Sequence, residues 1–383
     1  MKKTIGLLTL IQFFVYIGFG IIIPIIPELI ANMNGSALHI GWLLAVYSLA
    51  SFLTARLWGG IADRIGRRKV ILIGLLGFTI SFLMFALFIN HLAALYVSRM
   101  IGGLFAGALY TGSMSYVADI TSNENRNKYM GFVGMAIGLG FILGPAMGGL
   151  LSKVSIAFPF YISAGFMAFT FLLTFFVLKE SKPKQAARRQ SISIKDQLTG
   201  NLVPLFLFTF VTTLLLAGLE GTFQIYQIQK IDITPFEVGL LFMVSGLIDA
   251  GIQGGVMQKI KDGTETHWII MGQVVSAGGL LLMPLSYNLW FAGIFLAIFT
   301  AGNALVRTCT LSLITKKTDQ HGAATGASYS IDSLGRVLGP VVFTWIFEMH
   351  ALATFLTASL LGVLSITLII AYEKKKPIQM NSI

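Results

Sequence analysis

Charged residues are scarce in this chain of 383 amino acids. They make up 11% of the sequence, whereas hydrophobic residues make up 55%. An ordinary soluble domain carries about 25% charged residues. The composition therefore excludes that class and indicates a protein that crosses a membrane several times.

Cysteine and clustered histidine are also missing. Cys309 is the only cysteine, which excludes a disulfide within the chain and a cysteine-based metal site. The five histidines do not pair at the spacing of metal ligands. There is no phosphate-binding loop, nucleotide fingerprint or nucleophile–base set. We therefore expect no cofactor and no metal, and neither an ATP-driven pump nor an enzyme.

Long apolar runs dominate the chain instead. A membrane-spanning helix needs about 20 consecutive apolar residues, and the sequence predicts an all-α membrane protein with twelve transmembrane helices. The first run resembles a signal peptide, but its length and its two prolines, Pro24 and Pro27, favour a span. The predicted spans are residues 5–30, 39–61, 70–90, 94–116, 129–152, 157–178, 202–227, 236–257, 267–286, 290–313, 324–346 and 351–372.

The basic residues predict the orientation. Lysine and arginine number 27 against 16 acidic residues, which gives a net charge of +11. Apart from Lys153 and Lys230, those between the runs fall on the side that holds both termini. Because basic residues gather on the cytoplasmic side, we expect a multi-pass protein of the bacterial plasma membrane with both termini cytoplasmic. The same placement explains the charge without a nucleic-acid partner.

A polar stretch and an internal repeat divide the chain in two. Residues 179–200 are typical of a linker, and six runs lie on either side. We predict an N-terminal half over residues 1–178, a cytoplasmic linker over 179–200 and a C-terminal half over 201–383, with the binding site between the halves. The repeated positions are Gly131, Gly140, Gly144 and Pro145, which recur at the same spacing as Gly326, Gly335, Gly339 and Pro340.

The fifth run is rich in glycine. Gly140, Gly144 and Gly148 are four residues apart, so they share one face of a helix. Small faces let membrane helices approach closely, and Pro145 favours a kink. Two interpretations stay open. The helix either only packs, or it is a gating helix of a transporter that bends at Gly144 and Pro145.

Four motifs stand out in the runs and the segments between them. They are Gly59 to Lys69, Arg99 with Gly102, Gly103 and Gly107, Gly131 to Gly149, and Ile17 to Gly20 with Pro24 and Pro27. These motifs resemble those of the Major Facilitator Superfamily, and the resemblance extends over essentially the whole chain. Within that family the chain is similar to the drug:proton antiporter branch, in particular to quinolone and multidrug efflux pumps of Gram-positive bacteria. The resemblance implies two six-helix halves around a central cavity that opens alternately to each side.

Glu220 and Arg99 are the candidates for proton coupling. Both lie inside apolar runs, where charged side chains are rare and usually functional. A carboxyl group among aromatic residues such as Phe223 can exchange a proton for a cationic substrate. The resemblance implies the same role, since related pumps place an acid here and link the arginine motif to proton transfer. The alternatives are a structural ion pair for Glu220 and, for Arg99, a side chain that reaches the membrane surface.

Two sets of charged residues are candidates for gating. Asp63, Arg64 and Arg67 belong to the loop motif after the second run, and the resemblance suggests that this loop meets the start of the eleventh. The second set is either a static ion-pair cluster or an inner gate, because two of its members are four residues apart on one helix face. It consists of Asp249, Arg307, Asp332 and Arg336.

Aromatic residues are the main candidates for substrate binding, because their faces accept flat apolar molecules and attract cations. The predicted substrate-binding residues are Phe14, Tyr47, Tyr110, Phe141, Phe223, Asn303 and Arg307.

The sequence predicts a proton-coupled antiporter, acting as a monomer, that exports small amphipathic and often cationic drugs. Its expected partners are this substrate, protons and the lipid bilayer. An exporter of a lipid, sugar or small metabolite with the same fold is the alternative, although the few polar residues within the runs favour apolar cargo. A membrane sensor would need a soluble signalling domain, and no segment is long enough for one.

Overall fold

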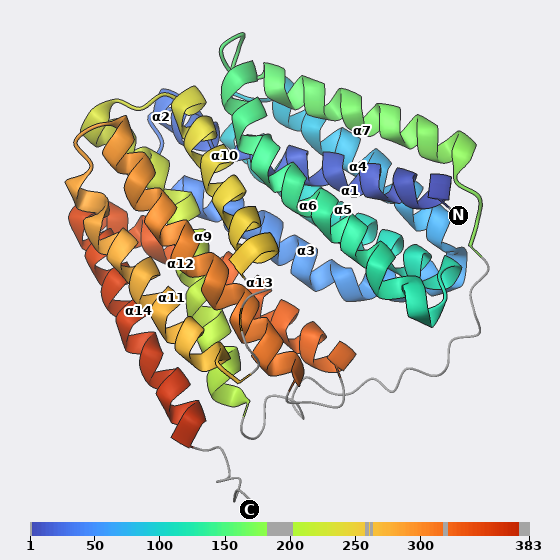
Figure 1. The fold of residues 1–383 in the computed structure, drawn as a ribbon. Helices are drawn as coiled ribbons and strands as arrows, with labels where there is room; N and C mark the ends of the chain where they lie inside the picture. The colour runs from blue at the N-terminus through green and yellow to red at the C-terminus, as the bar shows by residue number, and fades with distance from the viewer. Residues whose placement is uncertain (1, 182–201, 257–259, 261–262, 317–320, 375–383) are drawn as a thin grey trace, which may run out of the picture. The chain divides into compact units, whose positions relative to one another are not determined.

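The computed structural model describes residues 2–181, 202–256, 260, 263–316 and 321–374. Each of the twelve predicted spans corresponds to helix in it (Figure 1). Ten stretches of the described residues are long and apolar enough to cross a membrane, judged by length and composition. The first seven helices are α1 (Lys2–Ile22), α2 (Ile26–Asn32), α3 (Leu38–Ile65), α4 (Arg67–Leu87), α5 (Leu92–Ile120), α6 (Asn123–Leu151) and α7 (Phe158–Val177).

The second series begins after residue 201. Of the predicted linker over residues 179–200, only residues 179–181 lie within the described part of the chain. The π-helical residues Ile252–Val256 directly continue α10. The helices are α9 (Val203–Ile231), α10 (Pro235–Gly251), α11 (Glu265–Leu282), α12 (Leu289–Lys316), α13 (His321–Met349) and α14 (Ala351–Lys374).

The first predicted span contains a break. The α-helix stops at Ile22 and restarts at Ile26, so the span comprises α1 and α2 rather than one helix. Pro24 lies in the break and Pro27 in the first turn of α2. Proline has no N–H to donate and its ring presses on the preceding turn, which accounts for the interruption. The turn is buried all the same.

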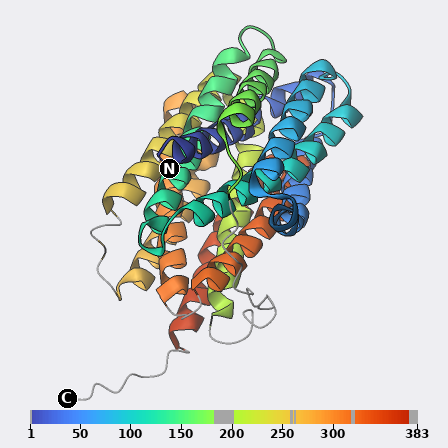
Figure 2. The ribbon, with the colours of Figure 1, turned by 90° about the vertical axis from the view of Figure 1, so that its right-hand side faces the viewer.

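The chain forms two compact units, and each includes a piece of α9 and α10. Unit 1 comprises Met1–Arg189 and Glu220–Leu247, and unit 2 comprises Gln190–Leu219 and Ile248–Ile383. Within unit 1, α1 packs on α6, and α5 packs on α3 and α4. Figure 2 shows the blue-to-green helices of unit 1 from a second direction. The predicted half boundaries stay a prediction.

Glycine brings α1 and α6 together. A Cβ atom added to Gly144 would lie 2.7 Å from the backbone oxygen of Ile17 and 2.8 Å from the Cα of Gly20. Gly140 and Gly148, one turn to either side, face the backbone of α1 in the same way. The predicted glycine face is therefore a packing seam, as expected of small residues between membrane helices. A bending role for Gly144 and Pro145 stays a prediction.

Unit 2 is built around α11. This helix packs on α12 and α14, and Gly272 and Gly302 approach each other backbone to backbone at the contact between α11 and α12. Cys309 is fully buried in the core of this unit, beside Val306 and Leu313. The single cysteine is thus part of the apolar core, where cysteine is often found.

Candidate functional site

Arg99 is buried deep inside unit 1. Its residue is only 3% exposed, which contradicts the alternative of a side chain reaching the membrane surface. Its Nε donates to the Leu43 carbonyl at 3.2 Å, and its guanidinium carbon lies 4.1 Å from the centre of the Tyr47 ring. Its Nη2 is buried without a hydrogen-bond partner in the described structure. A cation held by one carbonyl and one ring face retains donor capacity for a further acceptor.

A row of aromatic rings leads away from Arg99 across the helices of unit 1. The Tyr47 ring of α3 lies 5.2 Å from that of Phe19 on α1, and Phe19 lies 5.2 Å from Phe141 on α6. Tyr16 continues the row at 5.8 Å from Phe141. Tyr47 and Phe141 were both predicted to bind substrate, and the structure joins them through Phe19.

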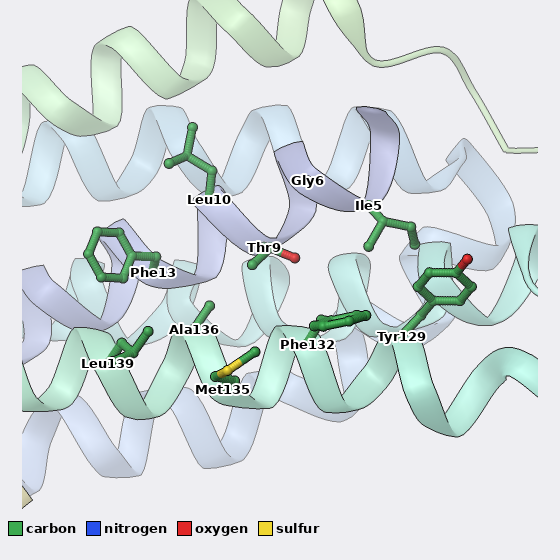
Figure 3. Close-up of a pocket in the computed structure, with 10 residues that line it drawn as sticks. All are labelled: Ile5, Gly6, Thr9, Leu10, Phe13, Tyr129, Phe132, Met135, Ala136 and Leu139. Atoms are coloured by element: carbon green, nitrogen blue, oxygen red, sulfur yellow. The ribbon is translucent and has the colours of Figure 1, made fainter. Parts of the chain in front are cut away.

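An apolar groove lies between α1 and α6 (Figure 3). Its volume is about 650 Å³, and none of its ten lining residues is charged. The residues labelled in Figure 3 come from both helices and line the space between them. The lining residues are Ile5, Gly6, Thr9, Leu10, Phe13, Tyr129, Phe132, Met135, Ala136 and Leu139.

None of the seven predicted substrate-binding residues lines this groove. Phe14 instead stacks on Phe166 of α7, at 4.8 Å between ring centres. The signal that could have found the groove is the helical spacing of Gly6, Thr9 and Phe13, which lie on one face of α1. Phe14 is the next residue along and points about 100° away.

Glu220 is partly buried on α9, within unit 1. Phe223 is fully buried one turn on, and its ring meets that of Phe242 on α10 edge to face at 5.7 Å. Gln224 is 1% exposed, and its Nε2 donates to the Pro24 carbonyl at 2.6 Å. The role of Glu220 and Arg99 in proton coupling stays a prediction.

The motif at the junction of α3 and α4 forms a charge cluster with the end of α5. Arg67 pairs with Asp63 at 2.5 Å and, through Nε, with Asp119 at 3.2 Å. Asp63 is largely exposed, whereas Arg67 and Asp119 are nearly buried. Arg64 of the same motif is exposed. Sequence reasoning missed Asp119, since nothing local links it to residues so far away in the chain.

Residues 179–181 are fastened to this cluster. The Tyr116 hydroxyl donates to the Lys179 carbonyl, the Arg68 backbone N–H donates to Glu180 at 3.1 Å, and the Ser181 hydroxyl donates to Asp119 at 2.9 Å. The beginning of the predicted linker therefore belongs to the packed structure of unit 1.

The second predicted set of charges is partly assembled in unit 2. Arg336 pairs with Asp332 at 3.2 Å, and the Thr213 hydroxyl donates to Asp332 at 2.6 Å. Arg307 is near enough to Asp332 to act on it electrostatically. Asp249 accepts a hydrogen bond from Gln253, one turn along, at 2.7 Å. The ion pair exists, while its opening as a gate stays a prediction. Asn303 is buried on α12, and Tyr110 is partly buried on α5 of unit 1.

Comparison with known families assigns the class. The sequence model of the Major Facilitator Superfamily matches residues 8–340. The chain therefore belongs to this family of membrane transporters. It is a multi-pass transporter rather than an enzyme, as the sequence predicted.

Several bacterial proteins are similar in sequence to almost the whole chain. "Multidrug resistance protein 2" of Bacillus subtilis is 29% identical over 388 residues, covering 98% of this chain and 96% of that protein. "Quinolone resistance protein NorA" of Staphylococcus aureus is 26% identical over 357 residues, with 91% of each chain covered. The chain thus resembles multidrug and quinolone efflux proteins.

Solved structures support the fold. A bacterial homologue of the human lysosomal transporter Spinster, in an inward-facing and occupied conformation, superposes with a TM-score of 0.84 at 13% identity, over 97% of each chain. The nucleoside transporter NupG gives 0.82 at 13% identity, over 97% of this chain and 100% of its own. At such identities the likeness concerns the fold alone, and it confirms the predicted major facilitator fold.

Proposed function

We propose that the protein exports amphipathic, often cationic drugs in exchange for protons. The observation that carries this proposal is a drug-sized apolar groove in a chain that resembles multidrug resistance proteins over nearly its whole length. Binding sites for drug-sized molecules occupy about 300–1,000 Å³ and are mainly apolar with aromatic walls. The groove between α1 and α6 fits both criteria.

The groove takes the flat apolar part of the substrate. Phe13, Phe132 and Tyr129 offer ring faces, and Met135 offers a flexible side chain that adapts to different shapes. Because the groove supplies no charged group, it selects for size and apolar surface rather than for one particular molecule. That property suits an exporter of many drugs better than a sugar carrier, which would need several hydrogen-bonding side chains in its wall.

We assign proton coupling to Glu220, with the buried Arg99 as the second candidate. A carboxyl group in an apolar helix can be neutralised either by a proton or by a cationic substrate, and not by both at once. Outward release of the substrate then follows protonation of Glu220, and inward loss of the proton restores the substrate site. The two predicted halves open the substrate site alternately to each side, with both termini on the cytoplasmic side of a bacterial plasma membrane.

The groove is tested by Phe132→Ala. Removing this ring is expected to weaken binding of a cationic dye to the purified protein about tenfold, since a lost aromatic contact of about 1.4 kcal/mol corresponds to that factor. Dye fluorescence during titration measures the effect. Phe132 is 40% exposed, so the substitution leaves the packed interior intact.

The matched control for the groove is Phe169→Ala. Phe169 is an equally large side chain on α7, 54% exposed and outside the groove. Its truncation is expected to leave dye affinity unchanged. Equal affinities for parent and Phe132→Ala, or an equal loss in both variants, would count against the groove as the binding wall.

A further inference from the structure

One end of unit 1 is closed by direct contact between segments far apart in the sequence. This end, called the distal end, holds the α1–α2 break and the connection between α9 and α10. A Cβ atom added to Gly149 would lie 2.7 Å from the Cα of Phe236, and Gly239 faces the Pro145 carbonyl as closely. The Lys153 amino group sits 3.4 Å from the centre of the Phe236 ring. The backbones of α6 and α10 touch here with no room for a side chain between them.

At the same end, a hydrogen bond from Gln224 to the carbonyl group of Pro24 joins α9 to the break between α1 and α2. That carbonyl lies between α1 and α2 and outside both helices, so it is available to a side-chain donor. The Gln224 Nε2 donates to it at 2.6 Å, and both residues are buried. The bond joins positions 200 residues apart in the sequence. It exists because the two prolines interrupt the first span.

The other end of the Gln224 amide is unsatisfied. Its Oε1 is buried and has no hydrogen-bond partner in the described structure. An amide oxygen only accepts hydrogen bonds, so a partner must bring an O–H or N–H group. Glu220 precedes Gln224 by four residues on α9 and is therefore its neighbour on the same helix face. A protonated Glu220 carries such an O–H group, and a carboxylate does not.

We propose that Gln224 is a positioning residue that lets the proton on Glu220 close the distal end. The neutral Glu220 donates to Gln224 Oε1, which holds the amide with its Nε2 on Pro24. The carboxylate instead repels that oxygen and loosens the bond. This inference rests on the proposed function: because the N-terminus is cytoplasmic there, the far end of the first span, and with it the distal end, faces outward. Closure of the distal end with a proton bound to Glu220 is then the step by which the transporter, empty of substrate, changes from the outward-open to the inward-open conformation.

Other charged groups near this end have contacts of their own. Lys153 lies over the Phe236 ring, Lys230 contacts the Tyr226 hydroxyl, and Glu237 accepts hydrogen bonds from Thr234. On α5, Arg99 is held by Leu43 and Tyr47. Glu28 of α2 and Asp232 after α9 are the remaining acidic groups of the distal end. Glu220 is the acidic group placed one turn from Gln224 on its own helix.

The test measures opening of the distal end by labelling a cysteine. The background replaces Cys309, the only native thiol, with alanine, and Ile25→Cys places a thiol in the buried turn beside Pro24. Right-side-out proteoliposomes with equal pH on both sides are treated with a membrane-impermeant maleimide. A maleimide reacts with the thiolate, whose amount rises with pH, so each rate is divided by the rate for the same variant denatured in detergent at the same pH. The normalised rate of the parent is expected to be about fivefold or more lower at acidic than at alkaline pH, as a coupling of the usual size would give, and the rates of the variants below are normalised in the same way.

The hydrogen bond from Gln224 to the Pro24 carbonyl is called the latch. Three variants separate loss of the latch from a general loss of stability. Glu220→Gln keeps an N–H donor without titrating, so it is expected to react slowly at both pH values. Gln224→Leu removes the latch and is expected to react quickly at both. Gln224→Asn, which keeps the amide on a shorter side chain, is expected to behave like Gln224→Leu and replaces it should the leucine variant not fold.

Gln273→Leu is the matched control. Gln273 is also buried, donates to the Gly362 carbonyl at 3.1 Å and has an unpartnered Oε1, but it lies wholly within unit 2. This variant is expected to keep the pH dependence of the parent. A parent without pH-dependent labelling, or Gln224 variants that label like the parent, would overturn the inference.

The labelling experiment needs neither a dye nor a pH gradient, so its result tests the latch independently of the proposed function. A parent that exports dye with protons, combined with Gln224 variants that label like the parent, overturns the latch alone. A parent with the expected labelling but without proton-driven export overturns the proposed function alone.

Discussion

Replacing Glu220 with glutamine is expected to reduce proton-driven export of a cationic dye at least about tenfold, down to passive leakage, because no group at this position then titrates. One unit of pH difference supplies about 1.4 kcal/mol per proton moved. A transporter that moves no proton cannot use that energy. Proteoliposomes with an imposed pH gradient, in which dye and proton fluxes are recorded together, measure the loss.

The control for this experiment is the same substitution at Glu348. That residue lies at the end of α13 and is exposed, so Glu348→Gln is expected to export at the parent's rate. Glu220→Gln should elute as monodisperse protein with the melting temperature of the parent, which shows that the variant is folded. Uphill export by Glu220→Gln at the rate of the parent would refute the coupling role.

Gly144→Leu is expected to destroy the packing of α1 on α6. The added side chain would meet the Ile17 carbonyl and the Gly20 Cα, both backbone atoms. Backbone cannot rotate aside as a side chain can, so the two helices must separate. Overpacking a tight site costs about 1–3 kcal/mol and sometimes more. We expect a sharp drop in the yield of monodisperse protein in detergent and a lower melting temperature.

Gly134→Leu and Gly138→Leu are the matched controls for this substitution. Both residues lie on α6, and a Cβ atom added to either would meet nothing within 4 Å. They are expected to fold like the parent, which separates the cost of close packing from the preference of a helix for leucine over glycine. Normal yield and melting of Gly144→Leu would show that the seam can open.

Sequence reasoning placed the apolar runs on helices because the length of such a run follows directly from the thickness of a bilayer. It also found the glycine seam, because a spacing of four residues places Gly140 and Gly144 on one face whatever surrounds them. The break at Pro24 was harder to predict, since helices in membranes often continue through proline.

The parts of the site that escaped prediction depend on contacts between distant segments. Phe13 rather than Phe14 lines the groove, and only the rotation of α1 against α6 decides between neighbouring residues. Asp119 meets Arg67, and Gln224 meets Pro24, across separations in the chain that no local pattern records. The sequence shows which residues could be functional, whereas the three-dimensional structure is needed to show which of them are in contact.

The anchoring of residues 179–181 bears on how this transporter can be divided into two genes. A first fragment that ends before Glu180 would lose two hydrogen bonds. These are the bond from the Arg68 backbone N–H to Glu180 and the bond from the Ser181 hydroxyl to Asp119. A cut after Ser181 preserves both. Co-expressed fragments should therefore be divided downstream of Ser181, so that the first fragment keeps the residues that form these hydrogen bonds.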